Sequence, residues 1–199
     1  MPRGVPKSGR KTKSQRIGDR GENRVTECLK TFIDENRLLH DIILSNGDST
    51  SQIDNIAVTS AGVFVIEVKN YCADIINCGV SWVYWNYYLG YNKYTFYNPI
   101  LQNSTHTELI KDLFNDDIPV HSVIVFSRNN PLKFVEGTKP RNVINDITKL
   151  RPYIESFAGN LSDEIQDKLI GIIKAEKRTD VTLAEHIDNI SKYIPKNNS

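Results

Sequence analysis

The sequence lacks the features that define several common classes of protein. No apolar run approaches the roughly 18–20 residues that a membrane helix needs, and the basic start has no apolar core typical of a secretory signal. The three cysteines include no CxxC pair, which argues against a disulfide scaffold and favours a cytoplasmic protein with reduced thiols. The GxxxxGKS/T and GxSxG motifs are also absent, so we expect neither a built-in NTPase nor an α/β-hydrolase.

An excess of charge of one sign is missing from the whole chain but present at its start. Lys and Arg total 25 against 24 Asp and Glu, so the net charge is close to zero. Residues 1–16 contain basic residues, Pro and Gly but no acid. This composition is typical of a flexible arm. Two interpretations stay open: the arm binds phosphates without sequence preference, or it only keeps the protein in solution. The basic residues are Arg3, Lys7, Arg10, Lys11, Lys13 and Arg16.

Length and composition suit one globular domain with a small appendage, since 39% of the 199 residues are hydrophobic and 25% are charged. Hydrophobic periodicity predicts a helix, several strands, a helix, a strand and then further helices. We therefore expect an α/β fold, with a short mixed β-sheet flanked by helices. The expected helices span 19–36, 98–114, 145–157, 162–177 and a segment from 182, and the expected strands span 41–45, 52–59, 63–69, 81–89, 93–97, 119–127 and 141–144.

This order divides the chain into three parts: the basic arm at 1–16, an α/β domain at 17–144 and a helical C-terminal extension at 145–199 packed on the core. The extension is amphipathic rather than basic, so it can cover the sheet, mediate a homodimer or dock another partner. The strands at 81–89 and 93–97 are dense in aromatic residues. Such residues either pack the strands, which is their commoner role, or stack on nucleobases.

The chemically informative segment runs from Gln52 to Asn70, where we expect two strands joined as a hairpin. Side chains alternate between the two faces of a strand, so one face of the second strand is wholly apolar. The other face becomes polar at its end, where Glu67 and Lys69 stand two residues apart. Asp54 ends an apolar row on the first strand in the same way. Each strand of the hairpin therefore ends such a row with an acid.

Whether the two acids meet depends on the turn between the strands. A two- or four-residue turn places Asp54 opposite Glu67 with Cβ atoms about 5 Å apart, whereas a three-residue turn sends them to opposite faces. We predict the former. At this distance two carboxylates repel each other by about 3 kcal/mol at an effective dielectric constant near 20, and a divalent cation removes this repulsion. Oxygen ligands suit Mg²⁺ or Mn²⁺, and Lys69 adds a donor for a water or a phosphate oxygen.

Glu22 supplies a third acid from the first predicted helix. Val25 and Leu29 follow it by three and seven residues, which places Glu22 on the core-facing side of that helix. A carboxylate on that side needs a partner. The alternative is structural: Asp19 and Glu22 have the spacing of a capping box, in which Glu22 only closes the first turn.

Several blocks of sequence occur in a characteristic order. They are Gly18-Asp-Arg-Gly-Glu22-x-x-Val25, then Gln52-Ile-Asp54, then Gly62-Val-Phe-Val-Ile-Glu67-Val-Lys69-Asn70, and finally Asn98-Pro99-Ile-x-Gln102. Together they resemble the nuclease-related domain (NERD) family, which belongs to the PD-(D/E)xK, restriction-endonuclease-like superfamily. The resemblance covers about residues 17–127. Ile53 stands where the superfamily name has proline, which this family does not require.

The resemblance implies a role for each matching residue. In the superfamily the Asp and the Glu bind the metal, helped by the backbone carbonyl between the Glu and the Lys. The Lys positions or activates the attacking water, and the helical Glu lies near the metal or its waters. Carried over, these are Asp54, Glu67, Val68 through its carbonyl, Lys69 and Glu22. We expect Gln102 in the site as well, and His106, one helical turn later, is a weaker candidate.

We therefore expect a Mg²⁺- or Mn²⁺-dependent nuclease, with DNA a better candidate than RNA as its nucleic-acid partner and no membrane partner. Two alternatives stay open. One is a non-catalytic module that binds nucleic acid or another partner and retains the nuclease fold. The other is an unrelated α/β protein in which Glu67 and Lys69 form an ion pair of little energetic value. The expected nucleic-acid contacts are Arg10, Lys11, Lys13, Arg16, Gln52 and Asn70.

Overall fold

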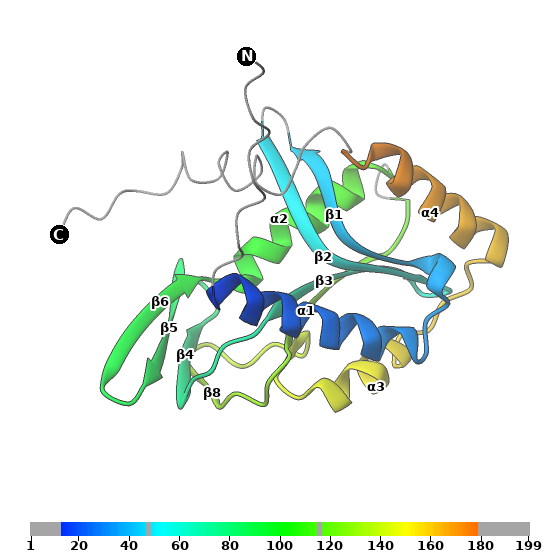
Figure 1. Cartoon of the computed structure of the whole chain (residues 1–199). Coiled ribbons are helices and arrows are strands. Elements are labelled where there is room, and N and C mark those ends of the chain that lie inside the picture. The colour runs from blue at the N-terminus through cyan, green and yellow to red at the C-terminus, as the bar shows by residue number, and fades with distance from the viewer. Residues whose placement is uncertain (1–12, 47–48, 115–116, 179–199) are drawn as a thin grey trace, which may run out of the picture.

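The computed structural model describes residues 13–46, 49–114 and 117–178. Over these ranges the chain forms a mixed α/β fold with two mixed sheets and four α-helices (Figure 1). Two short 3-10 helices, Glu35–Arg37 and Ile147–Lys149, precede the first strand and the third α-helix. The α-helices are α1 (Lys13–Lys30), α2 (Pro99–Asp112), α3 (Leu150–Glu155) and α4 (Asp163–Glu176).

The larger sheet has five strands in the order β1-β2-β3-β7-β9. β1, β2 and β3 pair antiparallel, whereas β3, β7 and β9 pair parallel. Each of these strands overlaps one that the sequence predicts. After α4 the chain returns to the outer strand β1, where Lys177 bridges Leu44 and the Arg178 backbone N–H donates to the Ile43 carbonyl at 2.8 Å. The strands are β1 (Leu38–Asn46), β2 (Ser49–Thr59), β3 (Gly62–Lys69), β7 (Val120–Phe126) and β9 (Val143–Ile144).

The β2–β3 hairpin has the register that we predicted. Residues 60–61 form a two-residue turn, and the pairing continues as far as Asn55 opposite Ile66. The next positions along the two strands are those of Asp54 and Glu67. The two acids therefore leave the hairpin at the same end.

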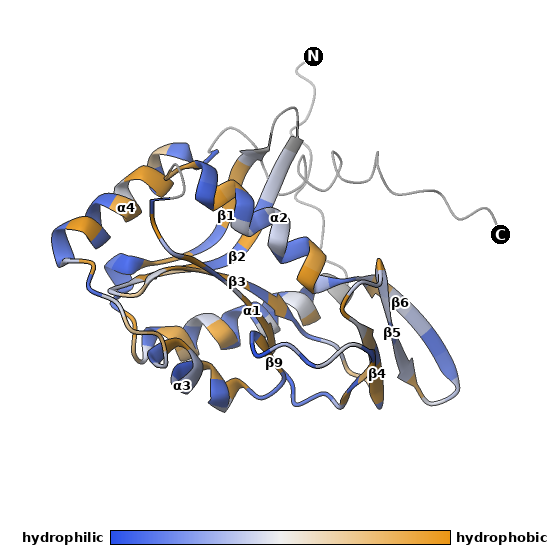
Figure 2. Ribbon diagram, turned by 180° about the vertical axis from the view of Figure 1, so that it is seen from behind, coloured by the Kyte–Doolittle hydropathy of each residue, from blue (hydrophilic) through white to orange (hydrophobic). Residues whose placement is uncertain are grey.

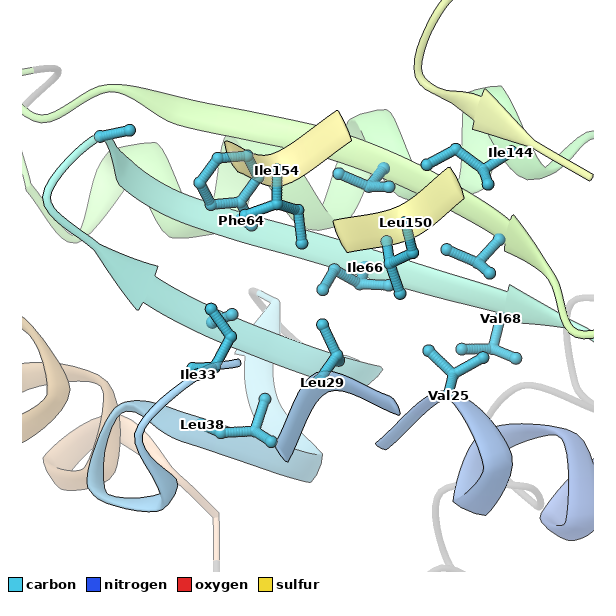
Figure 3. Close-up of a cluster of buried hydrophobic side chains, with 14 residues drawn as sticks. Val25, Leu29, Ile33, Leu38, Phe64, Ile66, Val68, Ile144, Leu150 and Ile154 are labelled. Atoms are coloured by element: carbon cyan, nitrogen blue, oxygen red, sulfur yellow. The ribbon is translucent and has the colours of Figure 1, made fainter. Parts of the chain in front are cut away.

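Helices cover both faces of the larger sheet. On one face, α1 and α3 pack against Phe64, Ile66 and Val68 of β3 (Figure 3). On the other face, α2 and α4 pack against a cluster that includes Val63 and Val65, and Figure 2 shows these two helices from that side. The alternation predicted for β3 is thus confirmed. The extension contributes α3 and α4 to opposite faces, so its described part covers the sheet.

A smaller sheet, in the order β6-β5-β4-β8, packs beside the larger one. The sequence predicted only β5 and β6. β4 and β8 escaped prediction because they are short and pair in parallel between segments far apart in the chain. The fully buried Trp85 stacks on Phe126 of the larger sheet, so part of the aromatic tract serves as core. The strands are β4 (Ile75–Gly79), β5 (Tyr84–Leu89), β6 (Asn92–Tyr97) and β8 (Leu132–Glu136).

The first helix starts earlier than predicted, at Lys13 rather than at Asp19. Lys13 and Arg16, which we expected in the flexible arm, therefore belong to α1. Gly18 and Gly21 weigh against a helix here, but at Gly21 the lack of a side chain lets α1 come very close to the sheet. A Cβ atom at Gly21 would lie only 2.3 Å from the Cβ atom of Asn70. Tertiary packing thus outweighs the low helix propensity of glycine.

The end of α1 also differs from the prediction, whereas the later helices agree with it more closely. α1 ends at Lys30 instead of Asn36, because the Asp34 side chain accepts a hydrogen bond from the Asn36 N–H and starts a separate 3-10 turn. The predicted helix at 145–157 is a 3-10 turn followed by α3, and the one at 162–177 is α4. The helix expected from 182 lies outside the described residues, as do residues 1–12 of the arm. Over the described ranges, no helix is both long and apolar enough to cross a membrane.

Asn98 joins the smaller sheet to the start of α2. Its side-chain oxygen accepts a hydrogen bond from the Ile100 N–H at 2.9 Å and caps the helix. Its amide nitrogen donates to the carbonyl oxygens of Gly79, Val80 and Trp82 at 3.3, 3.2 and 2.7 Å. This fully buried side chain therefore fixes α2 relative to the smaller sheet.

We expect Asn98→Asp to lower the free energy of unfolding by about 2–3 kcal/mol, although aspartate is as good a helix cap as asparagine. Aspartate keeps the acceptor for α2 but replaces the donor to the three carbonyl groups with a second, charged oxygen. Urea unfolding followed by circular dichroism measures the change. Asn92→Asp, at the exposed start of β6, is the matched control and should change stability by less than about 0.5 kcal/mol. Equal effects at the two positions would contradict the role of Asn98.

Candidate active site

The candidate site lies where the larger sheet splits. β2 pairs with β3 only as far as Asn55 but continues beside β1 to Ser49, while β3 stays paired with β7 as far as Lys69. Asp54 is thus the β2 residue next to the point where the pairing with β3 ends. Its Oδ2 atom accepts a hydrogen bond from the Val68 backbone N–H at 2.7 Å. The carboxylate bridges the two strands at the point where they separate.

Glu67 and Lys69 face each other at the end of β3. Lys69 Nζ lies 2.5 Å from Glu67 Oε1, and the side chains of Lys69 and Glu67 are only 15% and 3% exposed. The second oxygen, Glu67 Oε2, is buried and accepts no hydrogen bond within the described part of the chain, although His106 Nδ1 lies 3.5 Å away. A buried carboxylate oxygen without a donor is costly. Glu67 therefore has one oxygen bound to Lys69 and a second that lies near His106 without a hydrogen bond.

The helix α2 brings Gln102 and His106 to the same face of the sheet. The buried Asn103 anchors this helix, because its amide donates hydrogen bonds to backbone carbonyls of β3 and β7 at 2.9 and 3.2 Å. Gln102 Oε1 accepts a hydrogen bond from Lys69 Nζ at 2.9 Å. The Lys69 ammonium has three donor positions, and the side chains around it thus use two.

Glu22 approaches from α1, on the opposite face of the sheet. α1 begins well before it and has no acid in its first turn, so the capping-box interpretation of Glu22 is wrong. Burial raises the pKa of Glu22, and the carboxylates of Asp19, Asp41 and Glu67 raise it further. Glu22 therefore belongs to an acidic group that reaches around the end of β3.

Asp41 joins this acidic group, and no signal in the sequence indicated that it would. The β1–β2 register skips Asp41, which stands between His40 and Ile42, and its φ of 52° is rare for a residue other than glycine. Its Oδ1 atom accepts a hydrogen bond from Gln52 Nε2 at 2.7 Å. The alternation is interrupted here, because Ile53 and Ile56 lie in the same core cluster although they are three residues apart.

The site carries an excess of negative charge around one ammonium group. Burial raises the pKa of Asp54 well above its ordinary value, and Glu67 raises it further, while Lys69 opposes the shift. Burial lowers the pKa of Lys69, but the nearby Glu67, Tyr71 and Asp54 outweigh burial, and the net shift is upward. Lys69 therefore acts here as a charged hydrogen-bond donor.

The acids of the site form a small set of oxygen donors. No group of three or more His, Cys, Asp and Glu side chains comes close enough to hold a metal within the ranges that the structure describes. The smaller set at the split of the sheet consists of two carboxylates, Asp54 and Glu67, beside the backbone of Val68. Mg²⁺ commonly uses one or two carboxylates and keeps several waters. The oxygen-only set therefore fits a partly hydrated divalent cation.

Asn70 follows Lys69 and ties α1 to the sheet. Its Nδ2 atom donates to the Ile17 carbonyl, and its Oδ1 atom accepts from Ser127 Oγ at 2.9 Å and from Arg128 Nε at 3.1 Å. This residue, which we expected to contact nucleic acid, therefore also has a structural role. It holds the helix that carries Glu22.

The other expected nucleic-acid contacts are placed unevenly. Gln52 is close to the split of the sheet but is hydrogen-bonded to Asp41. Arg16 is exposed in the first turns of α1, and Lys13 begins that helix. Arg10 and Lys11 lie outside the described residues.

The comparisons with known proteins give a family and one curated relative. Residues 17–127 match the family model described as "Nuclease-related domain" (NERD). An uncharacterized protein of Bacillus anthracis is 30% identical over 172 residues, which cover 79% of this chain and 76% of that protein. No solved structure matches the chain significantly.

We expect Gly21→Ala to lower the free energy of unfolding by about 1–3 kcal/mol, because the added methyl group would overlap side chains behind α1. The Cβ atom would lie 2.3 Å from Asn70 Cβ and 2.8 Å from Ser127 Oγ. Gly18→Ala is the matched control in the same helix, since its Cβ atom would meet only Glu22 Oε1, at 3.7 Å. It should leave stability unchanged or raise it by up to about 1 kcal/mol. Thermal and urea unfolding measure both, and equal changes would contradict the close packing of α1.

Proposed function

The chain belongs to the nuclease-related domain family, and from that premise we propose that it is a metal-dependent nuclease that hydrolyses phosphodiester bonds, in DNA rather than RNA. We also propose that the larger sheet, with α1 and α2, is a restriction-endonuclease-like core. The observation that carries the proposal is the meeting of Asp54, Glu67 and Lys69 at the split of the sheet. Burying neighbouring acids there costs stability, so a ligand explains their position better than packing does.

We propose Asp54, Glu67 and the carbonyl oxygen of Val68 as ligands for Mg²⁺ or Mn²⁺, with Glu22 near the waters of the ion. When bound, the ion would supply a Lewis acid that neutralises charge on the phosphate. The protein's own part is to orient the ligands. The Val68 N–H holds the Asp54 carboxylate, and Lys69 holds one oxygen of Glu67, which leaves the other oxygen without a donor.

Lys69 would act on the substrate directly in this proposal. Two of its donor positions are taken by Glu67 and Gln102, and the third can donate to a phosphate oxygen or to the attacking water. An ammonium held in place stabilises negative charge that develops on the phosphate in the transition state. Gln102 is thus a positioning residue, because it fixes the direction of the Lys69 side chain.

The nucleic-acid backbone would approach from the start of α1. Arg16 is exposed there, and basic side chains favour phosphate through the release of counterions. In this proposal residues 17–144 form the nuclease domain, 145–199 are its extension, and 1–16 contribute contacts to phosphates. The proposed contact residues are Arg10, Lys11, Lys13, Arg16, Gln52 and Asn70.

We expect the protein to cleave labelled DNA in the presence of Mn²⁺ or Mg²⁺ and not in the presence of EDTA. Asp54→Asn should reduce the cleavage rate by at least about 100-fold. Asparagine keeps the size of the side chain and an acceptor for the Val68 N–H, but it removes the negative charge. Lys111→Ala, in an exposed ion pair with Glu108 on α2, is the control and should cleave at the wild-type rate.

Folding and metal binding are measured on the same variants. Asp54→Asn removes one of several mutually repelling carboxylates, so its melting temperature should equal or exceed that of the wild type. Mn²⁺ should raise the melting temperature of the wild type and not that of Asp54→Asn. Cleavage by Asp54→Asn at the wild-type rate would contradict the assignment. DNA binding without metal-dependent cleavage would identify a non-catalytic binding module instead.

A further inference from the structure

A pocket of about 490 Å³ opens beside Lys69, between the end of β3, the start of α1 and the β5–β6 hairpin. This volume lies within the range of about 300–1,000 Å³ that is typical of pockets for small organic ligands. The β5–β6 hairpin projects from the body of the protein near the first turns of α1 (Figure 1). The wall of the pocket includes Lys69, Asn70, Tyr71, Tyr87, Leu89 and Tyr94.

Three tyrosine rings form a row along this wall. The ring centroids of Tyr71 and Tyr87 are 4.9 Å apart, and those of Tyr87 and Tyr94 are 5.0 Å apart with nearly parallel planes. The inner rings, Tyr71 and Tyr87, pack against the core of the smaller sheet. At the outer end, however, Tyr94 is 43% exposed and Leu89 is 44% exposed. Packing therefore explains the inner two rings and leaves the outer ring and its apolar neighbour unexplained.

The opposite face of the same hairpin provides a comparison. Tyr84 and Tyr97 pair across the strands there, with their rings edge to face at 6.0 Å. Tyr97 is 44% exposed, almost the same fraction as Tyr94, but it does not line the pocket. The two tyrosines of β6 thus differ chiefly in whether they line the pocket.

We propose that this pocket binds an unpaired nucleobase of the strand to be cleaved, stacked on the tyrosine row, while an adjacent phosphate lies against Lys69. The inference rests on the proposed nuclease function and adds the substrate class, which is single-stranded nucleic acid or an unpaired segment of a duplex. A base inside a duplex has both faces covered, so it reaches such a pocket only after it is unstacked. Stacking on aromatic rings tolerates any base, because every base has a π-face.

Two positively charged side chains lie in or next to the wall of the pocket. Lys69 is part of the wall, and the exposed Arg128 donates a hydrogen bond at 3.1 Å to Asn70, which is also part of the wall. Positive charge beside aromatic rings is the combination by which proteins hold single strands. An uncharged apolar ligand would gain nothing from these two cations.

The test measures binding of a labelled oligothymidylate, and of a duplex of equal length, to the full chain in EDTA. Fluorescence anisotropy reports both affinities without cleavage. Tyr94→Ala should weaken single-strand binding by about tenfold or more and leave duplex binding within about twofold. Tyr94→Phe should bind the single strand like the wild type, because the ring is kept. Tyr97→Ala is the matched control and should leave both affinities within about twofold of the wild type.

A spectroscopic signature separates stacking from a general loss of affinity. An oligonucleotide that contains 2-aminopurine should lose fluorescence when it binds to the wild type and to Tyr94→Phe. The oligonucleotide should keep its fluorescence when it is saturated with the Tyr94→Ala variant. It should be quenched when it is saturated with the Tyr97→Ala variant. Quenching that persists at saturation in Tyr94→Ala would overturn the proposal.

The outcomes distinguish this inference from the proposed function. Equal weakening by Tyr94→Ala and Tyr97→Ala, or equal weakening of single-strand and duplex binding, overturns the base pocket. Wild-type affinity in Tyr94→Ala overturns it too and leaves the exposed rings to a protein contact. If the wild type cleaves DNA while Tyr94→Ala binds the single strand with wild-type affinity, the nuclease function is supported and the base pocket is overturned. If nothing is cleaved but Tyr94→Ala selectively loses single-strand binding, the pocket stands and the nuclease function fails.

Discussion

The buried charge of Glu67 is the constraint around which the rest of the structure is arranged. A carboxylate that is almost completely covered needs a cation, and Lys69 supplies one from the same strand at 2.5 Å. Lys69 in turn needs a second acceptor, which Gln102 provides only because Asn103 fixes α2 across β3 and β7. Asp54 then adds another acid, so one ammonium faces more negative charge than it can balance.

Three consecutive residues at the end of β3, Lys69, Asn70 and Tyr71, contact three different parts of the protein. Lys69 turns toward Glu67 and α2, Asn70 holds α1 against the end of β7, and Tyr71 packs against the smaller sheet. The acidic group and the tyrosine row thus meet at one short segment although they belong to different sheets. A displacement of this segment would alter all three contacts together, and α1 packs closely against it at Gly21.

Local patterns predict the centre of the site, and tertiary contacts decide its surroundings. The two-residue turn fixes the hairpin register, and that register brings Asp54 and Glu67 to the same end of the hairpin. Asp41 had no such signal, since its position depends on a left-handed backbone at a single residue. The early start of α1 depends on the fit of Gly21 against Asn70, and β4 and β8 find each other across a long stretch of chain. Helix and strand propensities carry no information about tertiary contacts of these kinds.

The return of the chain to β1 after α4 bears on how copies of this protein can associate. β1 is the outer strand of the larger sheet, and an open outer strand offers unpaired N–H and C=O groups to any extended peptide. The bridge from Lys177 to Leu44 and the bond from Arg178 to Ile43 occupy part of that edge. At Ile43 and Leu44 the edge is thereby closed to edge-to-edge pairing, and a second copy could pair with β1 at these two residues only after displacing this segment.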